Sequence, residues 1–300
     1  MRLRVSIPQP FNIDYTLESG QTFRWRKVGS SWYGVIGSTA VKVTQNKGML
    51  EVYSEETVAE EVILRYFGLE DDIDTIYKSI GKDRFIATLL AKYKGLRIVW
   101  QEPWETIFSF ITATNINIKR VAKTLNKLCS KIGTPKTLDG VTLYTFPSPQ
   151  AILEFREEGL RGVGFGYRAP WLLEAAKVLA TRQDLIINLV EESYEDARTL
   201  LLQSGIKGIG EKVADCILLF GFHKLEAFPI DRWVKQSIVN NYAHLFDADL
   251  ITNLEAKRSL NRVSYYNKIR RRMIEYFGRY AGYAQQYLFM HERLSGRSQA

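Results

Sequence analysis

Short runs in which apolar and polar residues alternate occupy the first part of the chain. They lie at residues 23–26, 31–36, 40–44 and 49–53, contain many aromatic and β-branched residues, and are separated by Gly, Asn and Ser. Alternation with a period of two is typical of strands with one buried face. The pattern predicts an antiparallel sheet between about Arg4 and Tyr53.

From about Glu56 the apolar residues recur at helical spacing, as in residues 58–67, and this pattern continues to the end without a repeat or a low-complexity linker. We therefore expect an α+β fold class: a small N-terminal antiparallel β-rich domain, then a mostly α-helical two-part region. The predicted domains are residues 1–98, the β-rich part with its following helices, and residues 99–300, with C-terminal helices at about 250–292.

Residues 201–233 contain the most informative pattern in the helical region. A helix ends near Ser204, a turn follows at residues 206–210, and a second helix opens at Glu211. This predicts a helix-hairpin-helix at about residues 195–221. Gly208 and Gly210 have no side chains, so backbone N–H groups at the start of the second helix can approach a phosphate. An ordinary turn between helices is the alternative.

Two residues in this stretch are candidates for chemistry. Lys212 stands in the first turn of the second helix, where the helix dipole disfavours a protonated amine and so favours a nucleophilic one. Asp231 follows Pro229 at a plausible N-cap position. Taken singly, a solvated lysine and a capping aspartate are the better explanations.

The composition narrows the classes of partner and cofactor. A net charge of +8 over 300 residues favours a polyanionic partner. Cys129 and Cys216 are the two cysteines, which excludes a disulfide framework and a four-thiolate iron–sulfur site. The chain has no apolar leader and no run long enough to span a membrane. An intracellular protein that does not use a membrane is expected.

The segment from Gly208 to Cys216, followed by Phe228-Pro229-Ile230-Asp231, resembles the helix-hairpin-helix, Gly/Pro-rich loop and aspartate motif of the DNA glycosylase superfamily. Within that superfamily it is most similar to the eukaryotic-type 8-oxoguanine DNA glycosylase/lyase. The segment Ser19-Gly20-Gln21-Thr22-Phe23-Arg24-Trp25 is similar to a second motif of this family. The resemblance implies that the Gly20 carbonyl accepts a hydrogen bond from the N7–H that oxidised guanine has and guanine lacks.

The resemblance also implies roles for residues elsewhere in the chain. It places Cys216 and Phe289 on the two faces of the flipped base and Gln285 at its Watson–Crick edge. Tyr167 would wedge into the base stack. The residues that would probe the estranged cytosine are Asn115, Arg120 and Arg168. The chain departs from the family pattern at Ile116, where an asparagine is usual, and at Trp233, where a histidine that contacts a phosphate is usual.

The implied activity is excision of 8-oxoguanine opposite cytosine from duplex DNA, with Lys212 as the nucleophile and Asp231 stabilising the positive charge on the sugar. No cofactor or catalytic metal is expected, although a structural cation could sit in the hairpin. A monomer acting on double-stranded DNA is expected, located with the DNA in the nucleoid, cytoplasm or nucleus. Two alternatives stay open: a glycosylase of the same superfamily for another damaged base, and a non-catalytic helix-hairpin-helix DNA-binding protein.

Overall fold

The computed structural model describes residues 1–255 and 263–297. Its N-terminal part is a five-stranded antiparallel sheet with the strand order β1-β5-β4-β3-β2. The strands are β1 (Arg2–Ser6), β2 (Arg26–Val28), β3 (Ser31–Ile36), β4 (Thr39–Asn46) and β5 (Met49–Tyr53). The sheet is formed mainly by β3, β4 and β5, which match three of the predicted runs and confirm the predicted sheet.

The strand predicted at residues 23–26 is wrong, because β2 begins only at Arg26. Arg24 is instead held by contacts outside the sheet. Its Nε and Nη2 donate to the two carboxylate oxygens of Glu105 at 2.6 and 2.7 Å, and its Nη1 donates to the Tyr144 carbonyl at 2.8 Å. Phe23 and Arg24 are both buried, so the alternation of this run does not mark a strand with one buried face.

Helices follow the sheet and interrupt its first connection. They are α1 (Ile13–Glu18), α2 (Glu60–Tyr66), α3 (Ile73–Ile80), α4 (Arg84–Lys92), α5 (Pro103–Thr112), α6 (Ile118–Ile132), α7 (Pro149–Val163), α8 (Ala169–Thr181), α9 (Gln183–Glu191), α10 (Tyr194–Leu202), α11 (Glu211–Gly221), α12 (Arg232–Asn241), α13 (Ala248–Glu255), α14 (Val263–Phe277) and α15 (Ala281–Arg297). Short 3-10 turns lie at Gly166–Arg168, Ala243–Leu245 and Gly278–Tyr280. The predicted α+β fold class is confirmed.

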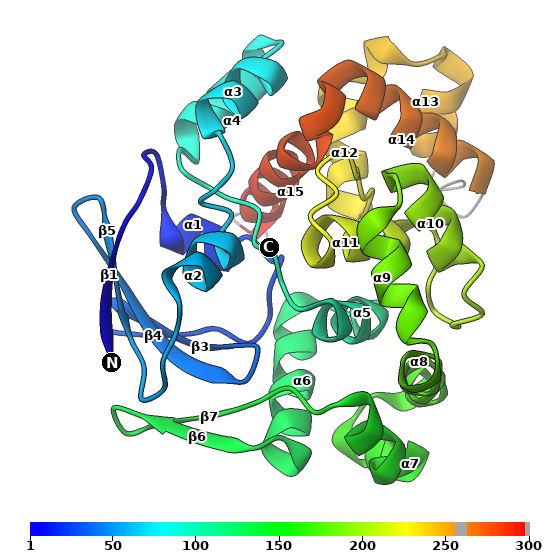
Figure 1. Ribbon diagram of the computed structural model, residues 1–300. Coiled ribbons are helices and arrows are strands. Elements are labelled where there is room, and N and C mark those ends of the chain that lie inside the picture. The colour runs from blue at the N-terminus through cyan, green and yellow to red at the C-terminus, as the bar shows by residue number, and fades with distance from the viewer. Residues whose placement is uncertain (256–262, 298–300) are drawn as a thin grey trace.

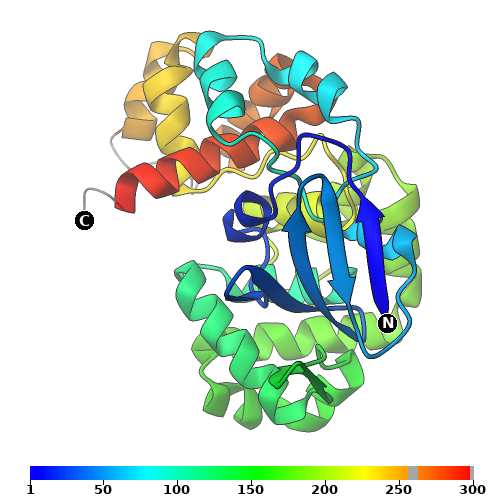
Figure 2. The ribbon, with the colours of Figure 1, turned by 90° about the vertical axis from the view of Figure 1, so that its left-hand side faces the viewer.

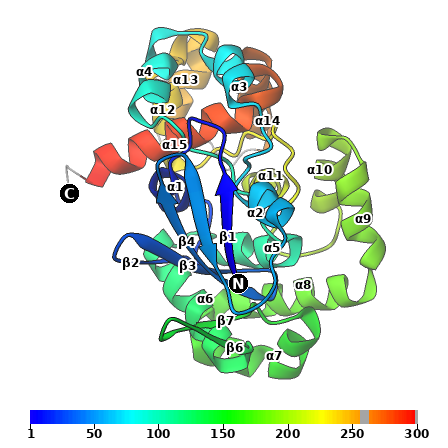
Figure 3. The ribbon, with the colours of Figure 1, turned by 60° about the vertical axis from the view of Figure 1, so that its left-hand side comes forward.

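The expectation of helices alone after the sheet is wrong at one place. A hairpin of β6 (Pro135–Leu138) and β7 (Val141–Tyr144) lies between α6 and α7 and packs against β3 and β4 (Figure 3). Asp139 and Gly140 both have positive φ, 49° and 74°, as a tight hairpin turn requires. This Asp-Gly pair is a hairpin signal that the helical interpretation overlooked.

The helices form two groups that are not contiguous in sequence. Helices α3 and α4 pack against α15, so residues that follow the sheet join the C-terminal helices α12 to α15 (Figure 1). Helices α5 to α8 form the other group, and α15 crosses the molecule between helices α12 to α14 and the sheet (Figure 2). Helix α11 packs against α5, α10 and α14. The predicted division of the chain at residue 98 stays a prediction.

None of the helices in the described part of the chain has the length and apolar character needed to cross a lipid bilayer.

Candidate active site

The predicted helix-hairpin-helix is present, with α10 ending at Leu202 and α11 opening after Gly210. The two hairpin glycines differ in their surroundings. Gly208 has a φ of 89°, and a methyl group there would lie 2.8 Å from Trp171 Cε3 and 3.1 Å from Ile111 Cγ2. A methyl group at Gly210 would meet nothing within 4 Å. Gly208 therefore allows close packing of the turn on α8, and Gly210 leaves the start of α11 open. Phosphate binding here stays a prediction.

Lys212 is the second residue of α11 and lies against an aromatic cluster. Its Nζ is 5.5 Å from the centroid of the Phe110 ring. Phe110 in turn stacks on Phe220, with 5.3 Å between ring centroids, and meets Phe23 edge-on at 5.6 Å. The lysine amine is thus held beside apolar rings, and Phe23 connects this place to the Ser19–Trp25 motif.

Asp231 caps α12, which confirms the predicted N-cap. Its Oδ1 accepts hydrogen bonds from the backbone N–H groups of Trp233 and Val234, both at 2.9 Å. Burial raises the pKa of the Asp231 carboxyl above its usual range, although these N–H groups and the neighbouring Lys212 side chain oppose the shift. An electrostatic interaction between Lys212 and Asp231 places the two candidates in one site.

Cys216 joins these two residues, one helical turn after Lys212. Burial raises the pKa of the Cys216 thiol to about 11, and both Lys212 and Asp231 act on it electrostatically. A thiol with such a pKa stays protonated at neutral pH, so it does not compete with the amine as a nucleophile. Cys216 instead offers a small, apolar surface.

Gly20 and Phe289 lie side by side, although the sequence separates them widely. Gly20 has a φ of 85°, and a methyl group there would lie 2.7 Å from Ile118 Cδ1 and 3.1 Å from Phe289 Cε1. Arg293 adds its guanidinium, 5.6 Å from the centroid of the Phe289 ring, and also donates to the Glu18 carbonyl. A side chain at position 20 would push into this group, which explains the glycine.

Gln285, on α15, is 4% exposed, and its Oε1 has no hydrogen-bond partner among the described residues. The next residue, Gln286, donates through Nε2 to the Ser19 carbonyl at 3.0 Å and so fixes α15 to the Gly20 segment. A buried acceptor without a partner is costly unless a ligand supplies a donor. Gln285 is therefore suited to accept an N–H from a bound molecule.

Tyr167, the predicted wedge, and Arg168, a predicted cytosine probe, lie beside the turn that follows α5. Arg168 is 8% exposed, and its Nε and Nη2 both donate to the Thr114 carbonyl, next to Asn115. Tyr167 is 48% exposed and stacks edge-on against Trp171, with 5.1 Å between centroids. Trp171 also contacts Gly208, so both Tyr167 and the turn of the helix-hairpin-helix pack against the same tryptophan.

Asn115 and Arg120 are both exposed. Asn115 has a left-handed backbone with a φ of 54°, and Arg120 stands in the first turn of α6, which Asn117 caps through its Oδ1 at 2.9 Å from the Arg120 N–H. The structure therefore brings Asn115, Tyr167 and Arg168 together. The roles of these residues toward a cytosine stay predictions.

Both departures from the family pattern have structural explanations. The ring of Trp233 packs on the end of α15, where a methyl group at Gly296 would lie 2.6 Å from Trp233 Cζ3. Arg232 covers Trp233 as well, with its guanidinium 4.5 Å from the ring centroid. Ile116 is half-buried and packs against the main hydrophobic core. The side chain at position 233 thus packs α12 against α15, whereas the histidine that is usual in the family can carry a positive charge.

Three residues in the site were not identified from the sequence: Phe110, Ile118 and Arg293. Arg293 follows Phe289 by four residues, the spacing that puts two side chains on one helix face, and this signal was available. Ile118 and Phe110 carry no signal of their own, because apolar helix residues look alike whether they line a core or a site.

Comparisons with known proteins find relatives over nearly the whole chain. Residues 3–107 match the family "8-oxoguanine DNA glycosylase, N-terminal domain", and residues 108–273 match "HhH-GPD superfamily base excision DNA repair protein". A probable N-glycosylase/DNA lyase from Methanothermobacter thermautotrophicus is 31% identical, and the match covers 95% of each chain.

Two solved structures extend the match to the fold. MBOgg1 in complex with a low-affinity DNA ligand has a TM-score of 0.86 at 30% identity, over 98% of this chain and 96% of that one. The Clostridium acetobutylicum 8-oxoguanine glycosylase/lyase, in complex with double-stranded DNA containing cytosine opposite 8-oxoguanine, has a TM-score of 0.84 at 26% identity, over 99% and 98%. The chain therefore belongs to the HhH-GPD superfamily of base excision DNA repair proteins and, within it, to the 8-oxoguanine DNA glycosylase/lyases.

Proposed function

We propose that the protein is a bifunctional DNA glycosylase and AP lyase that removes 8-oxoguanine paired with cytosine from duplex DNA. The observation that carries this proposal is the single site in which Lys212, Asp231 and Cys216 interact. A lyase needs an amine that can form a Schiff base, and a glycosylase needs a negative group to stabilise the positive charge that develops on the sugar. Relatives named N-glycosylase/DNA lyase support the assignment.

The side chains around Gly20 supply the recognition of the base. The damaged nucleotide is extruded from the helix, because its C1′ cannot be reached inside the duplex. Its ring lies between Cys216 and Phe289, the Gly20 carbonyl accepts the N7–H, and the Gln285 Oε1 accepts an N–H from the Watson–Crick edge. Asn115, Arg120 and Arg168 face the estranged cytosine, and Tyr167 fills the gap in the stack.

The chemistry starts from the neutral Lys212 amine. Its Nζ forms a bond to C1′ while the bond between C1′ and the base breaks, and the leaving base takes up the proton that the amine loses. Asp231 stabilises the positive charge on the sugar during this step. Opening of the sugar ring gives a Schiff base, and loss of a C2′ proton then expels the 3′ phosphate and cuts the strand. The reaction draws on no cofactor or catalytic metal, and the enzyme works where the DNA is.

The decisive experiment replaces the amine. Lys212→Gln should abolish both base excision and strand cutting on an 8-oxoguanine duplex, while the dissociation constant for that duplex changes less than about threefold. Borohydride should trap the wild type covalently on this DNA and should not trap the variant. Lys78→Gln, at an exposed position on α3, is the matched control and should trap like the wild type. Unchanged trapping of Lys212→Gln would refute the assignment of the nucleophile.

A second measurement separates the two alternatives. Incision is compared on duplexes that carry 8-oxoguanine, an alkylated purine or an oxidised pyrimidine. Preference for 8-oxoguanine supports the proposal, and preference for another base points to a different glycosylase of this superfamily. Stoichiometric binding without release of any base would identify a non-catalytic DNA-binding protein.

A further inference from the structure

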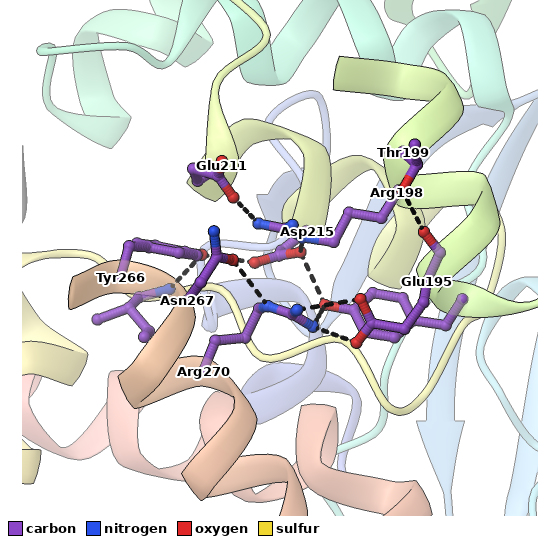
Figure 4. A network of polar contacts seen from close by, with 10 residues as sticks. Glu195, Arg198, Thr199, Glu211, Asp215, Tyr266, Asn267 and Arg270 are labelled. Carbon is purple, nitrogen blue, oxygen red and sulfur yellow. Dashed lines mark hydrogen bonds and ion pairs between the residues drawn. The ribbon is translucent and has the colours of Figure 1, made fainter. Parts of the chain in front are cut away.

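A buried polar network joins α10 and α14 to α11, the helix that carries Lys212 (Figure 4). At its centre the Asp215 carboxylate is 0% exposed and accepts three hydrogen bonds. The donors are the Tyr194 hydroxyl at 2.8 Å, Arg198 Nε at 2.7 Å and the Tyr266 hydroxyl at 2.6 Å. Asp215 lies three residues after Lys212, and thus on the same side of α11.

Further charges surround this centre. Arg270 donates to the Tyr194 hydroxyl at 3.0 Å and to both carboxylate oxygens of Glu195, at 2.7 and 3.0 Å (Figure 4). Arg198 also pairs with Glu211, the first residue of α11. Burying so many charges is costly, and an apolar replacement of similar volume is often just as stable. A network of this kind is better explained by the geometry it imposes than by stability alone.

Tyr266 has a second contact that extends the network to the active site. Its hydroxyl oxygen accepts the backbone N–H of Ile230 at 3.2 Å. Ile230 is 3% exposed and directly precedes Asp231. One hydroxyl group therefore connects the helix that carries Lys212 with the chain that carries Asp231.

We propose that Tyr266 is a positioning residue that holds the Asp231 carboxylate in register with the Lys212 amine. The Asp231 Oδ1 is engaged in capping α12, so its place depends on the backbone at residues 230–234. Among the described residues, Tyr266 is the side chain that hydrogen-bonds the N–H of Ile230 and the carboxylate of Asp215 at once. Displacing reacting groups by even 1 Å can slow a reaction by roughly 100-fold.

Tyr266→Phe tests this proposal, because it removes the hydroxyl and keeps the ring. With enzyme in excess over an 8-oxoguanine duplex, we expect the single-turnover excision rate to fall roughly 10- to 100-fold, with less than about a twofold change in DNA affinity. Tyr276→Phe is the matched control. It lies on the same helix and donates to Asp83 at 3.0 Å, away from Asp231, so its excision rate should match the wild type.

A double-variant comparison separates positioning from a general loss of structure. If Tyr266 acts through Asp231, Tyr266→Phe should slow excision less than about twofold further when Asp231→Asn is already present. Amide hydrogen exchange at Ile230 should also accelerate in Tyr266→Phe and not in Tyr276→Phe, a measurement that needs no activity. An unchanged excision rate in Tyr266→Phe would overturn the proposal, as would unchanged exchange at Ile230 or full additivity with Asp231→Asn.

This inference rests on the proposed function, and different results would contradict each of the two proposals. Absence of excision by the wild type would remove the proposed function, and the hydrogen-exchange result would still decide whether Tyr266 fixes the chain before Asp231. Normal excision by both the wild type and Tyr266→Phe would remove only the positioning role.

Discussion

Asp231 combines a proposed role in catalysis with a cost to the stability of the fold. Burial raises the pKa of its carboxyl, so keeping the group ionised at neutral pH opposes folding. The folded state holds the proton more tightly than the unfolded chain. Stability is therefore lost as the pH rises from the ordinary aspartate range through the raised pKa of Asp231. In the proposed mechanism, the same ionised carboxylate supplies a negative charge next to Lys212.

Replacing Asp231 with asparagine should separate these two effects. Asparagine keeps an oxygen that can cap α12 and removes the buried charge. We expect Asp231→Asn to lower the excision rate roughly 100-fold and to raise the unfolding temperature at pH 7 by roughly 2 °C. The gain in unfolding temperature should shrink as the pH is lowered below the raised pKa of Asp231, as thermal unfolding at several pH values would measure.

Asp72 provides the control for this prediction, because it caps α3 in the same way but with the opposite shift. The side-chain hydrogen bond from Thr75 lowers the pKa of Asp72. Its contribution to stability is present at neutral pH and is lost as the pH falls through the lowered pKa. Asp72→Asn should therefore not stabilise the protein at pH 7. Equal responses of the two variants would contradict the assigned cause.

At the scale of elements, the two glycines of the helix-hairpin-helix, Gly208 and Gly210, have different structural roles. Gly208 combines a positive φ with close packing on Trp171, whereas Gly210 has a φ of −103° and open space around it. Gly208→Ala should lower the free energy of unfolding by roughly 2 kcal/mol, because both the backbone and the packing resist a methyl group.

Gly210→Ala should lower the free energy of unfolding by about 1 kcal/mol or less, because alanine is a poorer N-cap than glycine but its methyl group would meet nothing within 4 Å. It should instead weaken binding to duplex DNA several-fold, because the methyl group stands where a phosphate would approach the N–H groups of α11. Urea unfolding and fluorescence anisotropy with labelled DNA measure the two effects. Loss of stability in Gly210→Ala without loss of affinity would show that the turn does not contact phosphate.

Helix starts could be predicted where the sequence itself contains a residue typical of the N-terminal end of a helix. Gly210 precedes α11 and Asp231 caps α12, and each signal lies next to the helix that it starts. The run at Phe23 failed because, in the sheet that the structure describes, its last residue, Arg26, pairs with β3 while the three residues before it lie outside the strand. Whether a short apolar run becomes a strand depends on what packs next to it.

At the scale of the whole molecule, Arg24 ties the N-terminal part to the helical region. Its guanidinium forms a two-bond pair with Glu105 on α5, and the side chain is only 6% exposed. Arg24→Met should lower the free energy of unfolding by about 3 kcal/mol, because it leaves the Glu105 carboxylate partly buried without its cation. Urea denaturation followed by circular dichroism measures the change.

The double variant Arg24→Met with Glu105→Met should recover much of that loss, because it removes both buried charges. Glu157→Met serves as the control, since Glu157 pairs with Arg161 on the surface of α7 and such pairs contribute little. If the double variant were as unstable as Arg24→Met, the unpaired charge would not be the cause.

The sequence alone determined the class of fold, the hairpin with Lys212, the capping role of Asp231 and the residues that resemble the motifs of a DNA glycosylase. These features depend on the spacing of residues that are close in sequence, so a short segment of the chain is enough to define each of them. Only the tertiary structure decided which distant segments meet: Gly20 with Phe289, Lys212 with Phe110, and Tyr266 with the chain before Asp231. Such contacts depend on how whole helices pack, and an apolar or aromatic residue has the same local pattern whether it ends in a core or beside a reacting amine.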